Sequence, residues 1–198
     1  MTSDGAVPLI PRDVRGIDDL LAEIERQDHE VSDLFEKVSD AAASWRPDPA
    51  RWSMTGHLTH LGMVNEAYVA AVEAAVDAAR MTGAPESDGP YAHPWIARRF
   101  VRMLEPPPRF RVKTMRSMVP ETGVEPADAL RRFHELQARL AGTARRARGL
   151  DLGRVRFSSP FFRLLRLSLG TGFEVVLAHN RRHVWLIREL MASEGFPG

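Results

Sequence analysis

The sequence contains no cysteine. This absence excludes a disulfide-stabilised scaffold, a zinc site with cysteine ligands and a nucleophilic thiol supplied by the protein. Any thiol that takes part in its chemistry must therefore come from a small molecule. Charge of one sign is also scarce, because the formal net charge of the 198 residues is only +1. Nothing in the overall charge drives the chain toward nucleic acid or an anionic membrane.

Long apolar runs are missing as well. No stretch is long enough to span a bilayer, and residues 1–11 lack the basic segment followed by an apolar run that marks a secretory signal. We therefore expect no stable membrane association and a reducing, cytoplasmic setting. Period-two alternation, internal repeats and low-complexity tracts do not persist anywhere in the chain. Strands and repeat architectures are thus not expected.

The sequence is rich in helical periodicity, with apolar residues recurring every three or four positions. The predicted long helices cover residues 17–43, 53–80, 126–149 and 172–192. A short helix is predicted at 95–104, and a connector with one helical turn at 154–166. Residues 1–15 are interpreted as a leader and 16–198 as a single domain. Four long amphipathic helices indicate an all-α fold, a four-helix bundle whose long connection carries the short extra helix.

The most informative motif is His179-x-x-x-His183 in the last predicted helix. Residues four apart lie one turn apart on the same helix face, so both imidazoles can bind one metal ion. They also occupy a stripe, with Val176 and Leu186, where apolar side chains would be expected. Buried imidazoles need partners, and a metal ion is one such partner. The alternative is a pair of core histidines hydrogen-bonded to other side chains.

A metal site needs at least one further ligand, and His60 in the second predicted helix is the best candidate. Its neighbour His57 lies on a nearby face of the same helix. The remaining histidines are weaker candidates. His29 and His134 stand among charged residues and are expected to be exposed, and His93 falls in or beside a loop.

The order of these motifs resembles the DinB-like superfamily, which is grouped with the YfiT-type metal-dependent hydrolases. The resemblance rests on Trp52-Ser53, then His60-Leu61, then His179-x-x-x-His183 far downstream. It covers residues 17–192. It implies an up-down-down-up four-helix bundle with His60, His179 and His183 as metal ligands. The sequence departs from the usual acidic residues at Gly56 and Asn180, and we interpret both departures as affecting capping and surface.

The resemblance also implies a function. Better understood members use a divalent metal ion, such as zinc or nickel, to activate a low-molecular-weight thiol such as mycothiol, and act as S-transferases or isomerases. Dimers are common among them, so a homodimer is expected here. Three neutral imidazoles leave open coordination positions at which a thiol or a water can lose its proton. The sequence thus predicts a small-molecule enzyme of this kind; the alternative is a non-catalytic bundle that binds a metal or a small ligand.

Two further segments allow weaker interpretations. A basic stretch near the end of the third predicted helix is interpreted as a solvated helix end, with carboxylate binding as the alternative; it comprises Arg145, Arg146, Arg148, Arg154 and Arg156. The apolar residues that surround Arg163 are interpreted as core, with a membrane surface or a second subunit as the alternative. These are Phe161, Phe162, Leu164, Leu165 and Leu167. Near His60, Glu66 and Tyr68 are candidates for proton handling, and Tyr68 is more simply a core residue.

Overall fold

The computed structural model describes residues 16–87, 89–92, 94–108, 114–162 and 164–198. It is mostly helical, which confirms the expected all-α class. The predicted leader and His93 lie outside the described residues. The long helices are α1 (Ile17–Glu36), α3 (Met54–Thr82), α5 (Pro126–Arg146) and α6 (Leu169–Met191). The shorter elements are α2 (Asp40–Ser44), α4 (Trp95–Leu104), η1 (Arg116–Met118), β1 (Arg156–Ser158) and β2 (Arg166–Ser168).

Capping side chains explain where the helices begin. The Ser53 hydroxyl accepts a hydrogen bond from the Gly56 amide at 3.0 Å, which starts α3 as expected. Ser39 caps α2 in the same way, and so the predicted helix over 17–43 is split in two. Ser168 accepts from the Thr171 amide, and α6 therefore begins three residues earlier than predicted. At the other end of α3, Gly83 adopts a left-handed conformation with φ of 63°.

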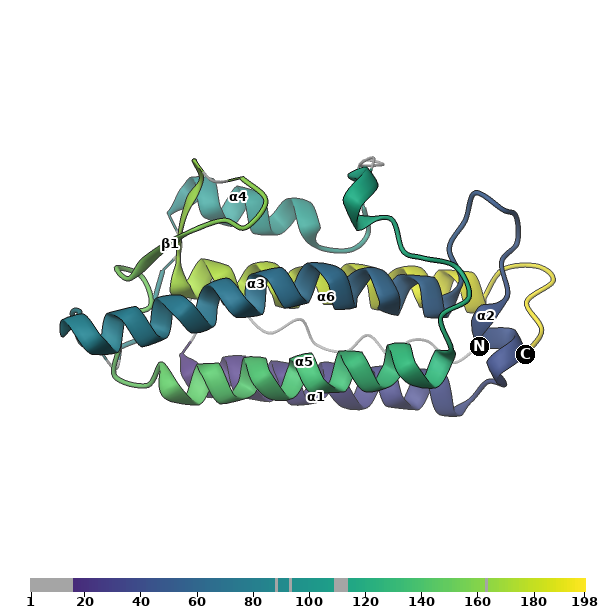
Figure 1. Cartoon of the computed structure of the whole chain (residues 1–198), viewed down its shortest axis with the longest axis horizontal. Helices are drawn as coiled ribbons and strands as arrows, with labels where there is room; N and C mark the ends of the chain where they lie inside the picture. The colour runs from purple at the N-terminus through teal and green to yellow at the C-terminus, as the bar shows by residue number, and fades with distance from the viewer. Residues whose placement is uncertain (1–15, 88, 93, 109–113, 163) are drawn as a thin grey trace, which may run out of the picture.

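The four long helices form two layers, with α3 and α6 in one and α1 and α5 in the other (Figure 1). Paired residues give the directions. His57 and Val72 of α3 lie near His183 and Gly172 of α6 respectively, so these two helices are antiparallel. The α4 helix lies against α6, outside the pair of layers. Among the described residues, no helix has both the length and the apolar character that crossing a bilayer requires.

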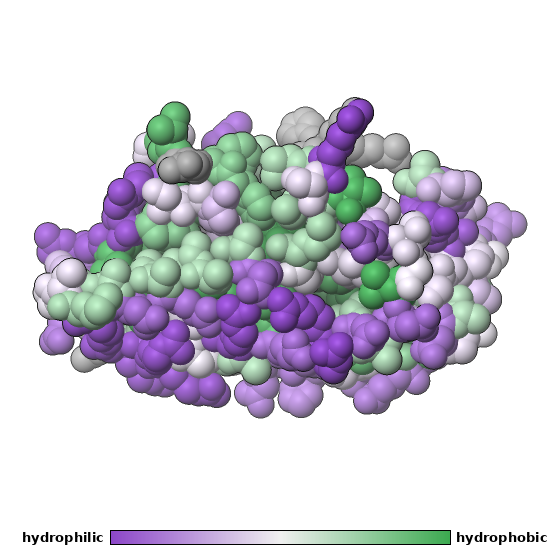
Figure 2. All heavy atoms as spheres, in the orientation of Figure 1, coloured by the Kyte–Doolittle hydropathy of each residue, from purple (hydrophilic) through white to green (hydrophobic). Residues whose placement is uncertain are grey.

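Within the other layer, α1 and α5 are also antiparallel, since Ile24 and Asp28 of α1 bond to Gln137 and His134 of α5. Helices of different layers run in parallel. Glu66 and Asp77 of α3 form ion pairs with Arg139 and Arg146 of α5 in the same order along both chains. Glu23 and Glu30 of α1 form ion pairs with Arg181 and Arg188 of α6, again in the same order along both helices. In the space-filling view, hydrophilic residues form a band along α5 and below α3, and hydrophobic residues gather above that band, over α3 and toward α4 (Figure 2).

The segment before α6 is a β-hairpin and not the connector with a helical turn that we predicted. Its strands β1 and β2 are antiparallel, with Phe157 opposite Leu167, and both of these side chains are buried. Each strand has only three residues, which is too short to produce a recognisable alternation in the sequence. A close approach places the hairpin against α6: a Cβ added to Gly172 would lie 2.7 Å from the Phe157 ring.

Four buried carboxamide side chains, one from each long helix, meet in the interior. The chain has only two asparagines and two glutamines, and all four belong to this layer. Asn180 of α6 is the centre: its amide nitrogen donates to Gln27 at 3.0 Å and to Gln137 at 3.2 Å, and its oxygen accepts from Asn65 at 2.9 Å. None of the four is more than 2% exposed. This finding corrects our interpretation of Asn180 as a surface departure.

The carboxamide layer predicts a large effect for Asn180→Leu. Leucine has a similar volume but leaves the hydrogen-bonding groups of Asn65, Gln27 and Gln137 buried without this partner. Each such group costs about 1–3 kcal/mol, so we expect the free energy of unfolding in urea to fall by at least about 3 kcal/mol. Glu189→Leu on the exposed side of α6 is the control and should change it by less than about 0.5 kcal/mol. Equal stability of the two variants would show that the layer is not needed.

Candidate metal centre

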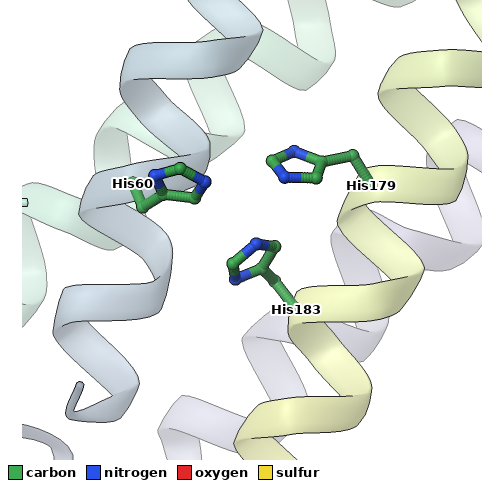
Figure 3. A group of neighbouring side chains, drawn as sticks. All are labelled: His60, His179 and His183. Atoms are coloured by element: carbon green, nitrogen blue, oxygen red, sulfur yellow. The ribbon is translucent and has the colours of Figure 1, made fainter. Parts of the chain in front are cut away.

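His60, His179 and His183 come together between α3 and α6. One ring nitrogen of each histidine lies within 4.8 Å of the corresponding nitrogens of the other two. Figure 3 shows the three imidazoles pointing toward a common centre, His60 from α3 and the other two from successive turns of α6. The three residues singled out in the sequence are therefore the ones that the fold brings together.

The hydrogen bond of His60 determines which of its nitrogens faces the centre. Its Nδ1 lies 2.7 Å from the carbonyl oxygen of Met118, at the end of η1. A carbonyl oxygen only accepts, so Nδ1 carries the proton and Nε2 keeps its lone pair. A backbone carbonyl that orients an imidazole in this manner is typical of histidine metal ligands. Met118 belongs to the long connection between α3 and α5, whose contact with His60 the sequence did not indicate.

His57 is the partner of His183. Their Nδ1 atoms lie 2.9 Å apart, so one ring donates and the other accepts. If His183 holds a metal ion through Nε2, its Nδ1 is protonated and donates to His57. His57 is thus outside the group of three nitrogens but supports it. The sequence placed His57 on a nearby face of α3 and gave no indication of this bond.

His179 has a sealed nitrogen that hydrogen bonding does not explain. Its Nδ1 is buried and has no hydrogen-bond partner among the residues that the structure describes. A buried polar atom without a partner is costly, which makes this histidine the least explained by hydrogen bonding alone. The interpretation of the pair as core histidines bonded to other side chains therefore holds for His183 but not for His179. The set of donors fits a divalent ion such as zinc, which imidazole nitrogens bind well.

The histidines are neutral near pH 7. Burial lowers the pKa of His57 and that of His179 to about 3, and the nearby His60 contributes to both shifts. Burial likewise lowers the pKa of His60, and it lowers the pKa of His183 well below its ordinary value. Neutral imidazole is the form that binds a metal ion, so the site needs no deprotonation at physiological pH.

A family model describes most of this chain. The model of the DinB superfamily matches residues 23–187, which include all three histidines and all four long helices in large part. The chain belongs to the DinB superfamily. Neither the curated proteins nor the solved structures include a match.

In this DinB-superfamily chain, Trp52 covers the histidine group on one side. Its ring stacks on His183 at an interplanar angle of 16° and a centroid distance of 6.0 Å. It also contacts His60 at 4.9 Å and His57 at 5.4 Å between centroids. The Trp-Ser pair of the sequence motif thus has two roles, since Ser53 caps α3 while Trp52 packs on the imidazoles that this helix presents.

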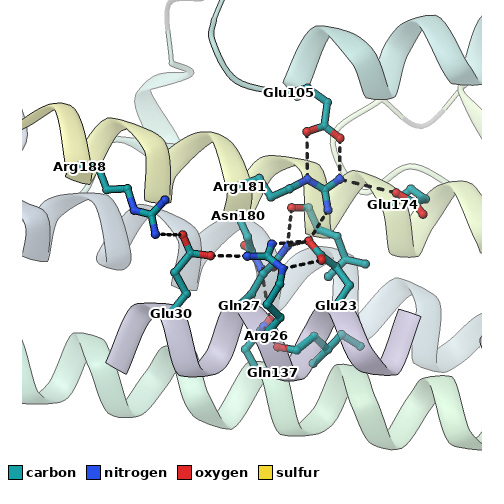
Figure 4. Close-up of polar contacts among 12 residues, drawn as sticks. Glu23, Arg26, Gln27, Glu30, Glu105, Gln137, Glu174, Asn180, Arg181 and Arg188 are labelled. Atoms are coloured by element: carbon teal, nitrogen blue, oxygen red, sulfur yellow. Dashed lines mark hydrogen bonds and ion pairs between the residues drawn. The ribbon is translucent and has the colours of Figure 1, made fainter. Parts of the chain in front are cut away.

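A buried charged cluster lies on the next face of α6 (Figure 4). Arg181 forms ion pairs at 2.6 Å with Glu23 of α1 and at 2.6 Å with Glu105 at the end of α4, and lies 3.8 Å from Glu174. Hydrogen bonds from Arg26 and the charge of Arg181 outweigh burial and lower the pKa of Glu23 to about 2. Three consecutive residues of α6, His179, Asn180 and Arg181, therefore face the histidine group, the carboxamide layer and this cluster respectively.

The other residues considered from the sequence lie elsewhere. His29 is exposed, and His134 bonds Asp28 at 2.6 Å, which leaves it only partly exposed. Glu66 forms ion pairs with Arg132 and Arg139 of α5, so it does not serve His60. Tyr68 is a core residue, bonded to Ser159 at 3.3 Å.

The two weaker segments have different outcomes. All five arginines of the basic stretch are exposed, as a solvated helix end requires. The apolar segment is core only in part. Leu167 is buried and Phe161 and Leu165 pack against the core, but Phe162 and Leu164 are 58% and 99% exposed at the turn of the hairpin. Both exposed residues lie between the two strands, outside the paired segments that contact α3 and α6.

The lowered histidine pKa values predict acid destabilisation of the metal-free protein. The unfolded chain takes up protons below pH 6.5 that the folded chain resists, so the free energy of unfolding should fall as the pH decreases from about 7 to 5. Each such histidine contributes about 1.4 kcal/mol per pH unit once the pH is well below 6.5. Urea unfolding after treatment with a chelator measures the slope.

Carboxylates contribute little to the change in unfolding free energy between pH 7 and 5, because their ordinary pKa values lie below this range. His57→Asn should reduce the slope by the contribution of one group. His29→Gln, which alters an exposed histidine, should leave it unchanged. A stability that does not vary between pH 7 and 5 would contradict the neutral, buried state of the group.

Proposed function

We propose that this protein is a divalent-metal-dependent enzyme that acts on small molecules, with His60, His179 and His183 as its metal ligands. The observation that carries the proposal is the convergence of three neutral imidazoles, two of which have Nδ1 engaged elsewhere. The family relationship supports it, since the match includes all three residues. The directions of the long helices support the up-down-down-up bundle of the DinB type as the frame of the site.

A divalent ion held by three histidines would lower the pKa of a thiol or a water molecule bound at an open position. We propose a low-molecular-weight thiol such as mycothiol as the activated group, in an S-transferase or isomerase reaction. The absence of cysteine supports this choice, because no side chain of the protein competes as a thiolate. Activation of water, as in a hydrolase, is the variant of the same proposal. We further propose that the protein acts in the cytoplasm and forms a homodimer.

The protein residues hold and orient the reactants. Met118 fixes the proton of His60 on Nδ1, and with a metal ion on Nε2 of His183 the Nδ1 of His57 would accept a hydrogen bond from His183. Trp52 shields these rings from water on one side. Rigid orientation of ligands by such contacts is worth about 10–100-fold in metal affinity. The second candidate function is a non-catalytic bundle that keeps the same metal site for structure or ligand binding.

Metal analysis of protein purified without an affinity tag tests the site. We expect elemental mass spectrometry of the purified protein to find about one divalent metal ion per chain. The ion should be lost in His183→Ala and His60→Ala because each variant removes one of only three ligands. His29→Ala is the matched control and should retain it. A wild-type protein that binds no divalent ion, even when zinc is added in excess, would refute the proposal.

Turnover separates the enzyme from the non-catalytic alternative. The metal-loaded protein is incubated with mycothiol, or with a simple thiol, and a panel of electrophiles, and thiol consumption is measured. We expect consumption that disappears in His183→Ala and is unchanged in His29→Ala. Stoichiometric metal without turnover of any thiol or ester would favour the binding protein.

A further inference from the structure

A small cavity borders His57 and Trp52, next to the candidate metal centre. Its volume is about 160 Å³, and its walls are Ala50, Arg51, Trp52, His57, Leu186 and Leu190. Because a water molecule occupies about 30 Å³ in the liquid, the space accommodates a molecule of about five heavy atoms. Two of the walls, Trp52 and His57, also contact the histidine group. The cavity is therefore separated from the metal ligands by a single layer of side chains.

His57 has one ring nitrogen without a hydrogen-bond partner among the described residues. Its side chain is buried, with 9% exposed, and its Nδ1 is engaged with His183 at 2.9 Å. The other nitrogen, Nε2, has no hydrogen-bond partner among the described residues, yet it is not one of the sealed atoms of the interior. Since His57 lines the cavity and its Nδ1 is engaged, Nε2 is the ring nitrogen left to bind a ligand there.

The hydrogen bond to His183 decides what Nε2 offers. A metal ion on Nε2 of His183 leaves the proton on its Nδ1, which donates to Nδ1 of His57. A neutral His57 that accepts at Nδ1 carries its own proton at Nε2, so it donates into the cavity. Arg51 lines the same cavity and adds a positive charge that acts on His57. The side-chain polar groups of the wall, including the indole N–H of Trp52, are then donors, and Leu186 and Leu190 supply its aliphatic part.

We propose that this cavity is a binding site for a small carboxylate, held by Nε2–H of His57 and the guanidinium of Arg51, with its alkyl part against Leu186 and Leu190. The proposal rests on the metal site proposed above, because the ion sets the direction of the His183–His57 bond. Hydrogen bonds from charged donors to a carboxylate are the stronger kind, and an aliphatic wall favours a short alkyl chain over an inorganic anion.

The two sites are coupled through the imidazole pair. In the metal-free protein, the proton between the two Nδ1 atoms can lie on either ring, and His57 offers a donor to the cavity in only one of these two states. Metal binding removes the other state. By linkage, the carboxylate must strengthen metal binding by the same factor by which the metal strengthens carboxylate binding. The cavity thereby senses whether the metal centre is loaded.

Titration with propionate tests the proposal. The protein is labelled with ¹⁵N at histidine and titrated at pH 7.5 in its zinc-loaded and metal-free forms. In the zinc-loaded form, we expect the His57 signals to report Nε2 protonated and Nδ1 unprotonated, and to shift on addition of propionate. We also expect the Kd for propionate to be at least about five-fold lower with zinc than without it.

Variants separate the cavity from the ion itself, which could also bind a carboxylate. Arg51→Gln should raise the Kd at least about five-fold while zinc remains stoichiometric. Arg145→Gln removes the same charge from an exposed position on α5 and should have no effect. Zinc binding without propionate binding, or a Kd that does not respond to Arg51→Gln, would overturn the carboxylate site alone. A protein that binds no zinc would instead overturn the metal site on which it rests.

Discussion

The register of the four long helices depends on the hydrogen bonds around Asn180. Each long helix places one carboxamide in the layer, and Asn180 bonds to all three of the others. A one-residue slip of any helix would turn its carboxamide away and leave buried polar groups unpaired, which costs far more than a comparable slip of apolar side chains. The layer therefore selects one alignment from the many that hydrophobic packing alone would allow.

This alignment also assembles the candidate metal centre. His179 directly precedes Asn180, and His60 stands five residues before Asn65 on the opposite helix. When Asn65 and Asn180 bond, the turn that carries His60 is placed opposite the turns that carry His179 and His183. Arg181 adds a second constraint, since its ion pairs hold α1 and the end of α4 against the other side of α6. The position of the three histidines therefore depends on the register of the helices. Asn180 and Arg181, which lie between His179 and His183, make the contacts that fix this register.

The long helices and the three histidines of the candidate site could be predicted from the sequence. The features that could not be predicted were missed for physical reasons. Helical periodicity located the long helices, because each hides one continuous apolar stripe, and the spacing of His179 and His183 indicated a shared face. The hairpin was missed because three residues are too few for an alternation, and the break before Asp40 was missed because Ser39 competes with helix continuation only through a local cap. The roles of His57, Met118 and Asn180 depend on contacts between residues more than fifty positions apart. No local pattern encodes such contacts.

The use of every carboxamide inside the bundle has a consequence for the durability of the protein. Asparagine and glutamine are thermolabile side chains, prone to slow hydrolysis of their amide groups in water. Here all four are at most 2% exposed and lie within helices, so the surface presents none of them to solvent. The chain also has no thiol. Neither amide hydrolysis of asparagine and glutamine nor oxidation of cysteine can therefore begin at the protein surface.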